Sequence, residues 1–300
     1  MNDQAQRLRE LAQQHNSVLP SSGPGGVRKV ARSPKTVQSA HAISVCSGKG
    51  GVGKSNIALS LALALTKLGK RVLLFDADLG LANIHVLLGI APVNNLSHFI
   101  SGNVALEDIV CEGPAGISIL PGATGLTEIA NLQQSHLQAV LQKLGTIEQQ
   151  YDMLLLDIGA GVSSQTIQLS AYADTALLVM TPEPTSLTDA YATAKILIQK
   201  GTTRIRVMVN MAGDEKEGRA IFEKLSQLTR KFLHAKLELA AVLPIDRTIP
   251  RLVRMQKTMM LERPSSPFAV RIRNYARVLC GMPVVRKEGF FSRIFNRDVR

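Results

Sequence analysis

The chain has 300 residues, of which 45% are hydrophobic and 4% aromatic, and its formal net charge is +12. This length allows one large α/β domain with short appendages and a sizeable core. No apolar run approaches the roughly 18 residues that a membrane-spanning helix needs, and the opening MNDQAQRLRE is too polar for a secretory signal. We therefore expect a cytoplasmic protein.

The first 40 residues differ in composition from the rest of the chain. Residues 1–16 are polar and favour a helix, whereas residues 17–40 are rich in Ser, Pro and Gly with basic residues between them. Such a composition is typical of a flexible linker. We predict a short N-terminal segment and linker over residues 1–40, followed by a domain over residues 41–281.

Apolar runs alternate with helical patterns throughout residues 41–281. Several runs are nearly continuous in Val, Leu and Ile, as in strands that are buried on both faces of a parallel sheet. Residues 214–233 predict a helix with one apolar stripe, formed by Ile221, Phe222, Leu225, Leu228 and Phe232. The alternation predicts an α/β fold, a doubly wound, mostly parallel sheet with helices on both faces. The expected strands are 42–46, 71–78, 117–122, 153–159, 175–183, 204–212 and 237–246.

The stretch CSGKGGVGKSN (46–56) lies between an expected strand and an expected helix and fits the phosphate-loop pattern Gly-x4-Gly-Lys-Ser. Glycines let backbone N–H groups turn toward phosphate oxygens, and the helix adds its positive dipole end. Lys54 would contact the β- and γ-phosphates of ATP, and the Ser55 hydroxyl would ligate Mg²⁺. The predicted nucleotide-binding residues of this loop are Gly48, Gly50, Gly51, Val52, Gly53, Lys54, Ser55 and Asn56.

Two acidic strand ends suggest hydrolysis rather than passive binding. Asp157 ends the apolar run LLLD, where it can hold a Mg²⁺-bound water, and the following Gly159 and Gly161 suggest a mobile loop. Asp76 and Asp78 end another run. Because they are two residues apart, they point to opposite sides if the strand continues, and we expect one of them to face the phosphates.

The last residues, 282–300, predict a basic amphipathic helix. Phe290, Phe291, Ile294 and Phe295 fall on one helical face. From residue 247 to the end there are thirteen Lys/Arg and three Asp/Glu, a local excess of ten. Such a helix suits the surface of an anionic membrane, although it could instead pack on the domain.

KGGVGKS (49–55) resembles the deviant phosphate loop of the MinD/ParA ATPases, and the resemblance covers roughly residues 41–281. It implies that Lys49 crosses a dimer interface to the partner's ATP and that Asp78 orients the attacking water. It also implies an adenine site at Asn210 and at Leu243–Asp246, which includes Pro244 and Asp246. ATP would then hold a homodimer together, and ADP would release it. The tail is similar to the membrane-targeting sequence of MinD-type proteins.

DQAQRLR (3–9) matches the element that begins many members of the FlhG/FleN (YlxH) branch of this family. In that branch the segment activates FlhF, the GTPase of flagellar placement, so the resemblance assigns a partner contact to Asp3, Gln4, Ala5, Leu8 and Arg9. It also implies flagellar switch or C-ring proteins and a flagellar transcription activator as partners. His85 departs from the branch, which usually carries Asp there; we expect hydrolysis to be intact.

Two other functions fit parts of the sequence. A ParA-like DNA-segregation ATPase would use the same site and contact DNA through basic residues such as Arg247, Arg251 and Arg271. That alternative leaves the Phe-rich tail and DQAQRLR unexplained. An iron–sulfur carrier on this fold would need closely spaced or interface cysteines, and Cys46, Cys111 and Cys280 form no CxxC pair.

Overall fold

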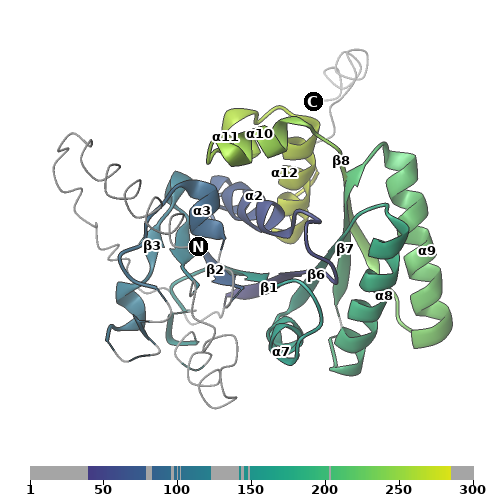
Figure 1. Ribbon diagram of the computed structural model, residues 1–300, viewed down its shortest axis with the longest axis horizontal. Helices are drawn as coiled ribbons and strands as arrows, with labels where there is room; N and C mark the ends of the chain where they lie inside the picture. The colour runs from purple at the N-terminus through teal and green to yellow at the C-terminus, as the bar shows by residue number, and fades with distance from the viewer. Residues whose placement is uncertain are drawn as a thin grey trace, which may run out of the picture. The chain divides into compact units, whose positions relative to one another are not determined.

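Among the described residues, eight strands form one sheet in the order β3-β4-β2-β5-β1-β6-β7-β8 (Figure 1). The structure is a computed structural model, and it describes residues 40–78, 83–95, 98–99, 101, 103–122, 142, 145–147, 149–202 and 204–284. The predicted N-terminal segment and the predicted C-terminal helix lie outside these residues. They therefore remain predictions.

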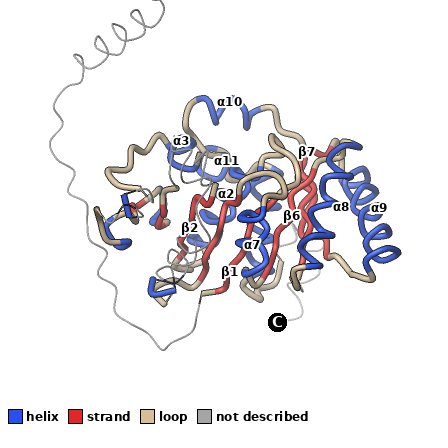
Figure 2. Tube along the Cα trace, turned by 60° about the horizontal axis from the view of Figure 1, so that its bottom comes forward, coloured by secondary structure: helices blue, strands red, loops and turns tan. Residues whose placement is uncertain are grey.

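The sheet is parallel except at one edge, where β3 pairs with β4 in the antiparallel direction. Figure 2 labels β2, β1, β6 and β7, which lie in this order across the sheet, with β5 between β2 and β1. The strands are β1 (His41–Cys46), β2 (Val72–Ala77), β3 (Cys111–Glu112), β4 (Ser118–Leu120), β5 (Met153–Ile158), β6 (Thr175–Met180), β7 (Ile205–Ala212) and β8 (Glu238–Pro244). The seven predicted strands are confirmed with shifted ends. The two-residue strand β3 was not predicted, because so short a segment has no periodicity.

Helices cover both faces of the sheet, as the doubly wound fold requires. The buried side chains of α2, α11 and α12 belong to one hydrophobic cluster, and those of α7, α8 and α9 belong to the other. The helices are α2 (Lys54–Lys67), α3 (Ile84–Leu88), α7 (Ser164–Tyr172), α8 (Pro184–Gln199), α9 (Glu215–Leu233), α10 (Thr248–Arg254), α11 (Met259–Glu262) and α12 (Pro267–Leu279), with 3₁₀ turns η1 (Leu106–Asp108) and η2 (Pro114–Gly116).

The burial of each strand agrees with its sequence. All six residues of β2 and all six of β6 are buried, as expected for strands with a helix layer on each side. The run after the phosphate loop, residues 57–65, is buried along its whole length within α2. This helix therefore lies between the sheet and other helices, and the phosphate loop at its start is held on a rigid base.

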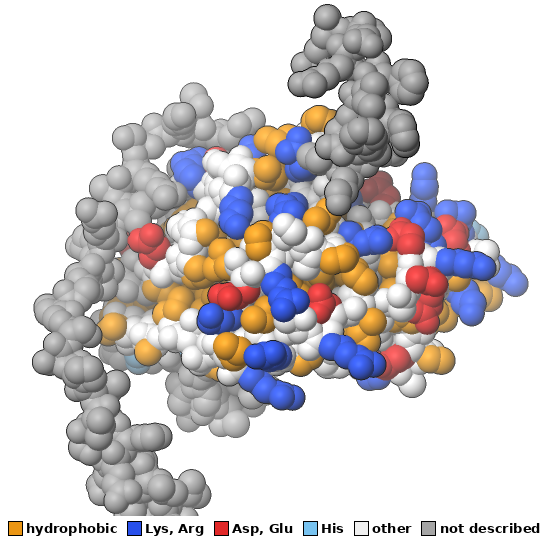
Figure 3. All heavy atoms as spheres, turned by 90° about the horizontal axis from the view of Figure 1, so that it is seen from above, with side chains coloured by type: hydrophobic (Ala, Val, Ile, Leu, Met, Phe, Trp, Pro, Cys, Tyr) orange, Lys and Arg blue, Asp and Glu red, His pale blue; other side chains and the backbone are white. Residues whose placement is uncertain are grey.

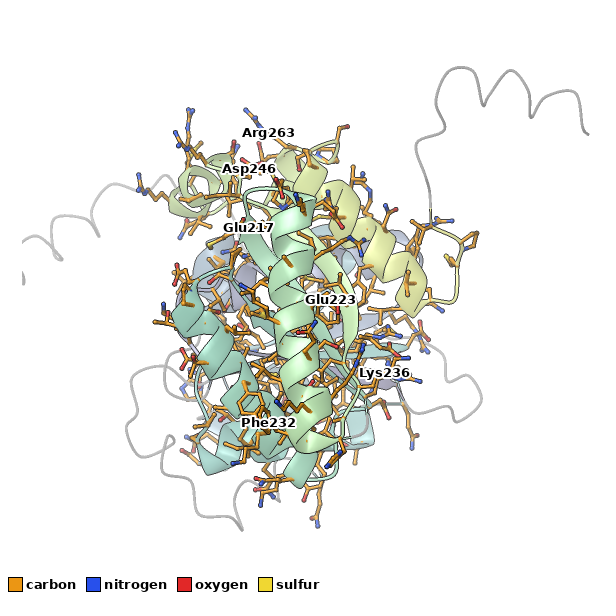
Figure 4. All side chains as sticks on the ribbon, turned by 90° about the vertical axis from the view of Figure 1, so that its right-hand side faces the viewer. Glu217, Glu223, Phe232, Lys236, Asp246 and Arg263 are labelled. Carbon is orange, nitrogen blue, oxygen red and sulfur yellow. The ribbon has the colours of Figure 1, made fainter. Side chains whose placement is uncertain are left out.

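The predicted stripe of α9 is wrong at its last member. Ile221, Phe222 and Leu225 are buried, but 57% of the Phe232 side chain is exposed. Phe232 lies in the final turn of α9, near its lower end in Figure 4, and the ammonium of Lys231 lies 5.2 Å from the centre of its ring. The buried face is completed instead by Thr229. No helix among the described residues has the length and apolar character to cross a bilayer.

Candidate nucleotide site

The phosphate loop connects the carboxyl end of β1 to α2, the place where α/β sheets bind ligands. Gly53 has φ of 87°, a left-handed conformation that favours glycine. A Cβ atom at Gly53 would lie 2.5 Å from Nδ2 of Asn210. This nitrogen donates to the carbonyl oxygen of Val52 over 2.8 Å. Any larger residue at this position would therefore have a strained backbone and would displace the Asn210 side chain from Val52.

The loop is also packed tightly against α8 at its first glycine. A Cβ atom at Gly48 would lie 2.4 Å from the carbonyl oxygen of Asp189 and 2.7 Å from Oγ1 of Thr193. Both contact atoms belong to the interior of α8. The two positions thus require glycine for different reasons: Gly48 permits close packing on a helix, and Gly53 permits a left-handed turn.

Lys54 and Asp157 form a buried ion pair. The ammonium nitrogen lies 2.8 Å from Oδ1 of Asp157, and the two side chains are 9% and 1% exposed. Burial raises the pKa of Asp157, and the Lys54 ammonium opposes this effect. The second oxygen, Oδ2, is buried and has no hydrogen-bond partner among the described residues.

That oxygen fits a Mg²⁺ site. Mg²⁺ takes oxygen ligands, keeps several waters and is usually bound by one or two side chains together with nucleotide phosphates. Asp157 supplies a carboxylate oxygen at the carboxyl end of β5, and Ser55 supplies a hydroxyl in the first turn of α2. The two predicted metal residues therefore have the right chemistry and lie on elements that meet at the phosphate loop.

Asp76 and Asp78 occupy different environments. Asp76 lies opposite Asp157 in the register of β2 and β5, is fully buried, and accepts a hydrogen bond from the backbone N–H of Ile84 at 2.8 Å. Its pKa is raised to about 7, chiefly by burial and also by the nearby Asp157, whereas the Ile84 N–H acts to lower it. Asp78 follows the end of β2 and lies against Gly159, where a Cβ atom would be 3.1 Å from its Oδ1.

This arrangement assigns the two acids different tasks. Asp76 anchors the start of α3, whereas Asp78 is partly exposed and faces the loop that follows Asp157. A carboxylate that can reach water suits the orientation of an attacking water better than one that is fully buried. The geometry thus favours Asp78 for that role.

Lys49 is held by the start of α8. Its ammonium lies 2.7 Å from Oε2 of Glu183 and 3.1 Å from Oγ1 of Thr185, and its carbonyl oxygen accepts the Ser47 hydroxyl at 2.9 Å. The Lys49 and Glu183 side chains are 40% and 61% exposed. The sequence places Glu183 at the end of an expected strand, on the side where such sheets bind ligands, but it does not show the contact with Lys49; in the structure Glu183 directly precedes Pro184, the first residue of α8.

The residues predicted for adenine lie at the ends of β7 and β8. Asn210 is 5% exposed and bonded to the phosphate loop, as described above. Pro244 ends β8 opposite Ala212, and Oδ1 of Asp246 accepts the backbone N–H of Thr248 at 2.8 Å. Figure 4 shows Asp246 at the same end of the domain as the start of α9. The fold therefore brings Asn210, Pro244 and Asp246 to one edge of the sheet.

A strand, a glycine-rich loop with a buried lysine, a helix and a neighbouring strand-end aspartate define a P-loop nucleoside triphosphatase. Comparisons agree with this class. Residues 38–280 match the ParA family model, which is described as NUBPL iron-transfer P-loop NTPase. The chain is 39% identical to antiactivator FleN of Pseudomonas aeruginosa, over 81% of this chain and 87% of FleN. It is 32% identical to flagellum site-determining protein YlxH of Helicobacter pylori, over 98% of each chain.

Comparisons with solved structures support the same class of protein. The MinC:MinD complex of Aquifex aeolicus matches with a TM-score of 0.69 and 26% identity, over 83% of this chain and 99% of that one. MinD of Pyrococcus horikoshii, solved with Mg-ADP, matches with a TM-score of 0.67 and 26% identity, over 80% and 96%. The chain belongs to the ParA/MinD family of P-loop ATPases, in the branch of FleN and YlxH.

The residues predicted to contact the membrane and the partner protein have no described position. The membrane residues Phe290, Phe291, Ile294 and Phe295 lie beyond residue 284, and the partner residues Asp3, Gln4, Ala5, Leu8 and Arg9 lie before residue 40. His85, the position at which the resemblance led us to expect Asp, lies in α3, and its Nδ1 is buried without a hydrogen-bond partner among the described residues.

Proposed function

We propose that this protein is a MinD-like ATPase that regulates the number or placement of flagella. The observation that carries the proposal is the similarity to YlxH and FleN over most of each chain, together with a complete phosphate loop. The printed names of those relatives refer to a flagellum site and to an antiactivator. An antiactivator acts on a transcription activator, which supports such a partner here.

We assign the roles of the site residues from the family resemblance, and their positions support the assignment. Lys54 exchanges its bond to Asp157 for the β- and γ-phosphates of ATP, and the loop N–H groups bind the remaining phosphate oxygens. Ser55 and Asp157 would hold Mg²⁺, Asp157 through a water, and the ion would supply positive charge beside the phosphates. Asp78 orients the attacking water, and Asn210, Pro244 and Asp246 bind the adenine.

Lys49 makes the ATP state a dimer. It lies on the loop surface, and its described partners are the exposed Glu183 and Thr185, so it can leave them at low cost. In the homodimer it contacts the phosphates of the partner's ATP. Because ADP lacks the γ-phosphate, hydrolysis removes part of this attraction and the dimer dissociates.

In this proposal the C-terminal segment binds the membrane, and the N-terminal segment binds a partner protein. Dimerisation presents two copies of the predicted C-terminal helix to the anionic inner face of the cell membrane, and two weak anchors bind far more tightly than one. The segment with DQAQRLR stimulates an FlhF-type GTPase, and the same ATPase meets flagellar switch or C-ring proteins. These partners rest on the sequence resemblance.

Sedimentation with anionic liposomes, in ATP and in ADP, tests the cycle. We compare the wild type with Lys49→Ala, with a chain that ends at Lys287, and with Lys200→Ala, an exposed lysine at the end of α8 that serves as the control. The proposal expects ATP-dependent sedimentation that is lost in the first two variants and retained in Lys200→Ala. ATP-dependent retention on duplex DNA without liposome binding would contradict it and favour a ParA-like role.

The cysteines do not support iron transfer, despite the description of the family model. Cys46 is buried in the central strand β1, Cys111 lies in the edge strand β3, and Cys280 follows α12. Burial raises the pKa of the Cys46 thiol to about 12. A thiol of that kind is a poor metal ligand, because metal binding requires the thiolate.

A further inference from the structure

A groove of about 570 Å³ lies outside the phosphate site, between the end of α3, the turn η2 and the connection from α10 to α11. We call it the α3–α11 groove. Leu88, Ile90, Pro114 and Leu261 give it apolar walls. Its volume is within the range of ligand-binding clefts in proteins.

The floor of the α3–α11 groove is built from fixed parts. Gln256 has φ of 55°, and the backbone N–H of the next residue donates to the carbonyl oxygen of Leu252, which ends α10 in a Schellman turn. The side chain of Gln256 reaches Gly89, where a Cβ atom would lie 2.6 Å from its Oε1. Thr258 lines the same groove; it is 7% exposed, and its hydroxyl has no hydrogen-bond partner among the described residues. The groove therefore offers a buried polar group to an occupant.

The elements around the α3–α11 groove expose aliphatic side chains. The exposed fractions are 52% for Val86 in α3, 51% for Met255 after α10 and 40% for Leu261 in α11. Exposed aliphatic side chains on adjoining elements mark a surface for another macromolecule rather than for a small ligand alone. Figure 3, which views the molecule from the top of Figure 1, shows apolar and basic side chains intermixed on this face.

The charge around the α3–α11 groove is positive. Four exposed cations lie in α10 or after α10 and α11, and two exposed acids lie in α11 and in β3, which leaves an excess of two positive charges. One pair is internal, with Lys257 Nζ 3.3 Å from Glu262 Oε1. The cations are Arg251, Arg254, Lys257 and Arg263, and the acids are Glu112 and Glu262. The occupant should carry acidic groups beside its apolar ones.

Both walls of the α3–α11 groove start beside strand ends to which the proposed function, on which the coupling below rests, assigns nucleotide contacts. The wall from α3 begins at Ile84, whose N–H is bound by Asp76 at the end of β2. The wall from α10 begins two residues after Asp246, which accepts the N–H groups of Thr248 and Ile249 through its side chain and its carbonyl oxygen. A change at either strand end would therefore alter the width of the groove.

We propose that the α3–α11 groove docks an amphipathic helix of a partner protein, with apolar residues in the groove and Asp or Glu residues beside the arginines, and that docking is coupled to the bound nucleotide. Helices dock in this way in many apolar grooves. DNA would match the cations but leave the aliphatic walls without a partner. A bilayer surface cannot enter a concave site. By reciprocity, an occupant that prefers one nucleotide state also stabilises that state.

The test uses the full-length chain and a labelled synthetic helix of about four turns, with leucines on one face and glutamates flanking them. Fluorescence anisotropy gives its affinity in ADP and in a non-hydrolysable ATP analogue. The variants are Leu261→Asp, in the groove, and Phe232→Asp, a matched exposed apolar residue on α9. Arg254→Glu serves as a second groove variant, because its side chain is exposed and its replacement leaves the core intact.

The proposal expects the affinity for the peptide to fall roughly tenfold or more in Leu261→Asp and Arg254→Glu but not in Phe232→Asp. It also expects the affinity to differ between ADP and the ATP analogue. A lysine version of the peptide should not bind. No binding below about 1 mM, equal loss in Phe232→Asp, or displacement by duplex DNA or anionic vesicles overturns the docking proposal. Equal affinity in both nucleotides overturns the coupling. The assay uses no lipid as ligand, so its failure is distinguishable from failure of the membrane cycle.

Discussion

The ammonium of Lys49 lies 2.7 Å from the carboxylate of Glu183, and this pair is exposed to solvent. Five residues later in the same loop, Lys54 makes an ion pair of nearly the same length that is almost fully buried. The distances are alike, but the surroundings differ. Exposed pairs stabilise proteins little, whereas removing one partner from a buried pair leaves an uncompensated charge.

This contrast predicts unequal costs for two substitutions. Asp157→Ala should lower the free energy of unfolding by about 3–5 kcal/mol, because Lys54 is left buried without a counter-charge. Glu183→Gln should lower it by about 1 kcal/mol or less. Denaturant unfolding without nucleotide measures both. Similar losses in the two variants would contradict the assignment of a buried and an exposed pair.

The bond between Asn210 and Val52 predicts how the base is bound. Nδ2 of Asn210 donates to the loop carbonyl, so Oδ1 is left as an acceptor, which suits the amino group of adenine. We expect Asn210→Ala to weaken ATP binding by about tenfold, the effect of roughly 1.4 kcal/mol. Titration calorimetry measures the affinity, with Asn103→Ala, at an exposed residue, as the control. Unchanged affinity in Asn210→Ala would remove this residue from the base site.

The pair of Arg71 and Asp152 predicts a pH dependence of stability. Oδ1 of Asp152 accepts from Nη2 of Arg71 at 2.7 Å, and this hydrogen bond lowers the pKa of Asp152 despite partial burial. A carboxylate whose pKa is lowered on folding adds stability above its unfolded pKa, about 3.9, and this stability is lost as the pH falls through the folded value.

Asp152→Asn should therefore cost stability at neutral pH and little in acid. We expect a difference of about 1 kcal/mol or less at pH 7, because the pair is partly exposed. Urea unfolding at about pH 7, 5 and 3 follows the difference between wild type and variant. A difference that grows toward acid would show that the variant acts through another contact.

Short sequence patterns predict those parts of the site that depend only on neighbouring residues in the chain. The phosphate loop, Asp157 and Asn210 were identifiable because each lies at the carboxyl end of an apolar strand, and parallel strands end at one edge of the sheet. The burial of Asp76 and the contact of Lys49 with Glu183 were not, because these depend on strand register and on the position of α8. The α3–α11 groove joins segments more than a hundred residues apart, which no local pattern reports.

Substitutions at two glycines distinguish the effect of backbone strain from the effect of a steric clash. Gly53 and Gly69 have φ of 87° and 81°, so alanine is strained at both, at a cost of about 1–3 kcal/mol. At Gly69 a Cβ atom would meet nothing within 4 Å, whereas at Gly53 it would lie 2.5 Å from Nδ2 of Asn210. Gly69→Ala should therefore lower stability alone, and Gly53→Ala should lower stability further and also weaken ATP binding, because Asn210 must leave Val52.

Thermal unfolding with and without ATP distinguishes the two effects. In Gly69→Ala the rise in Tm that ATP produces should match that of the wild type, because ligand stabilisation depends on affinity and concentration. In Gly53→Ala the rise should shrink at the same ATP concentration. An equal rise in both variants would mean that the close approach of Gly53 to Asn210 does not matter for binding, and strain alone would then explain the glycine.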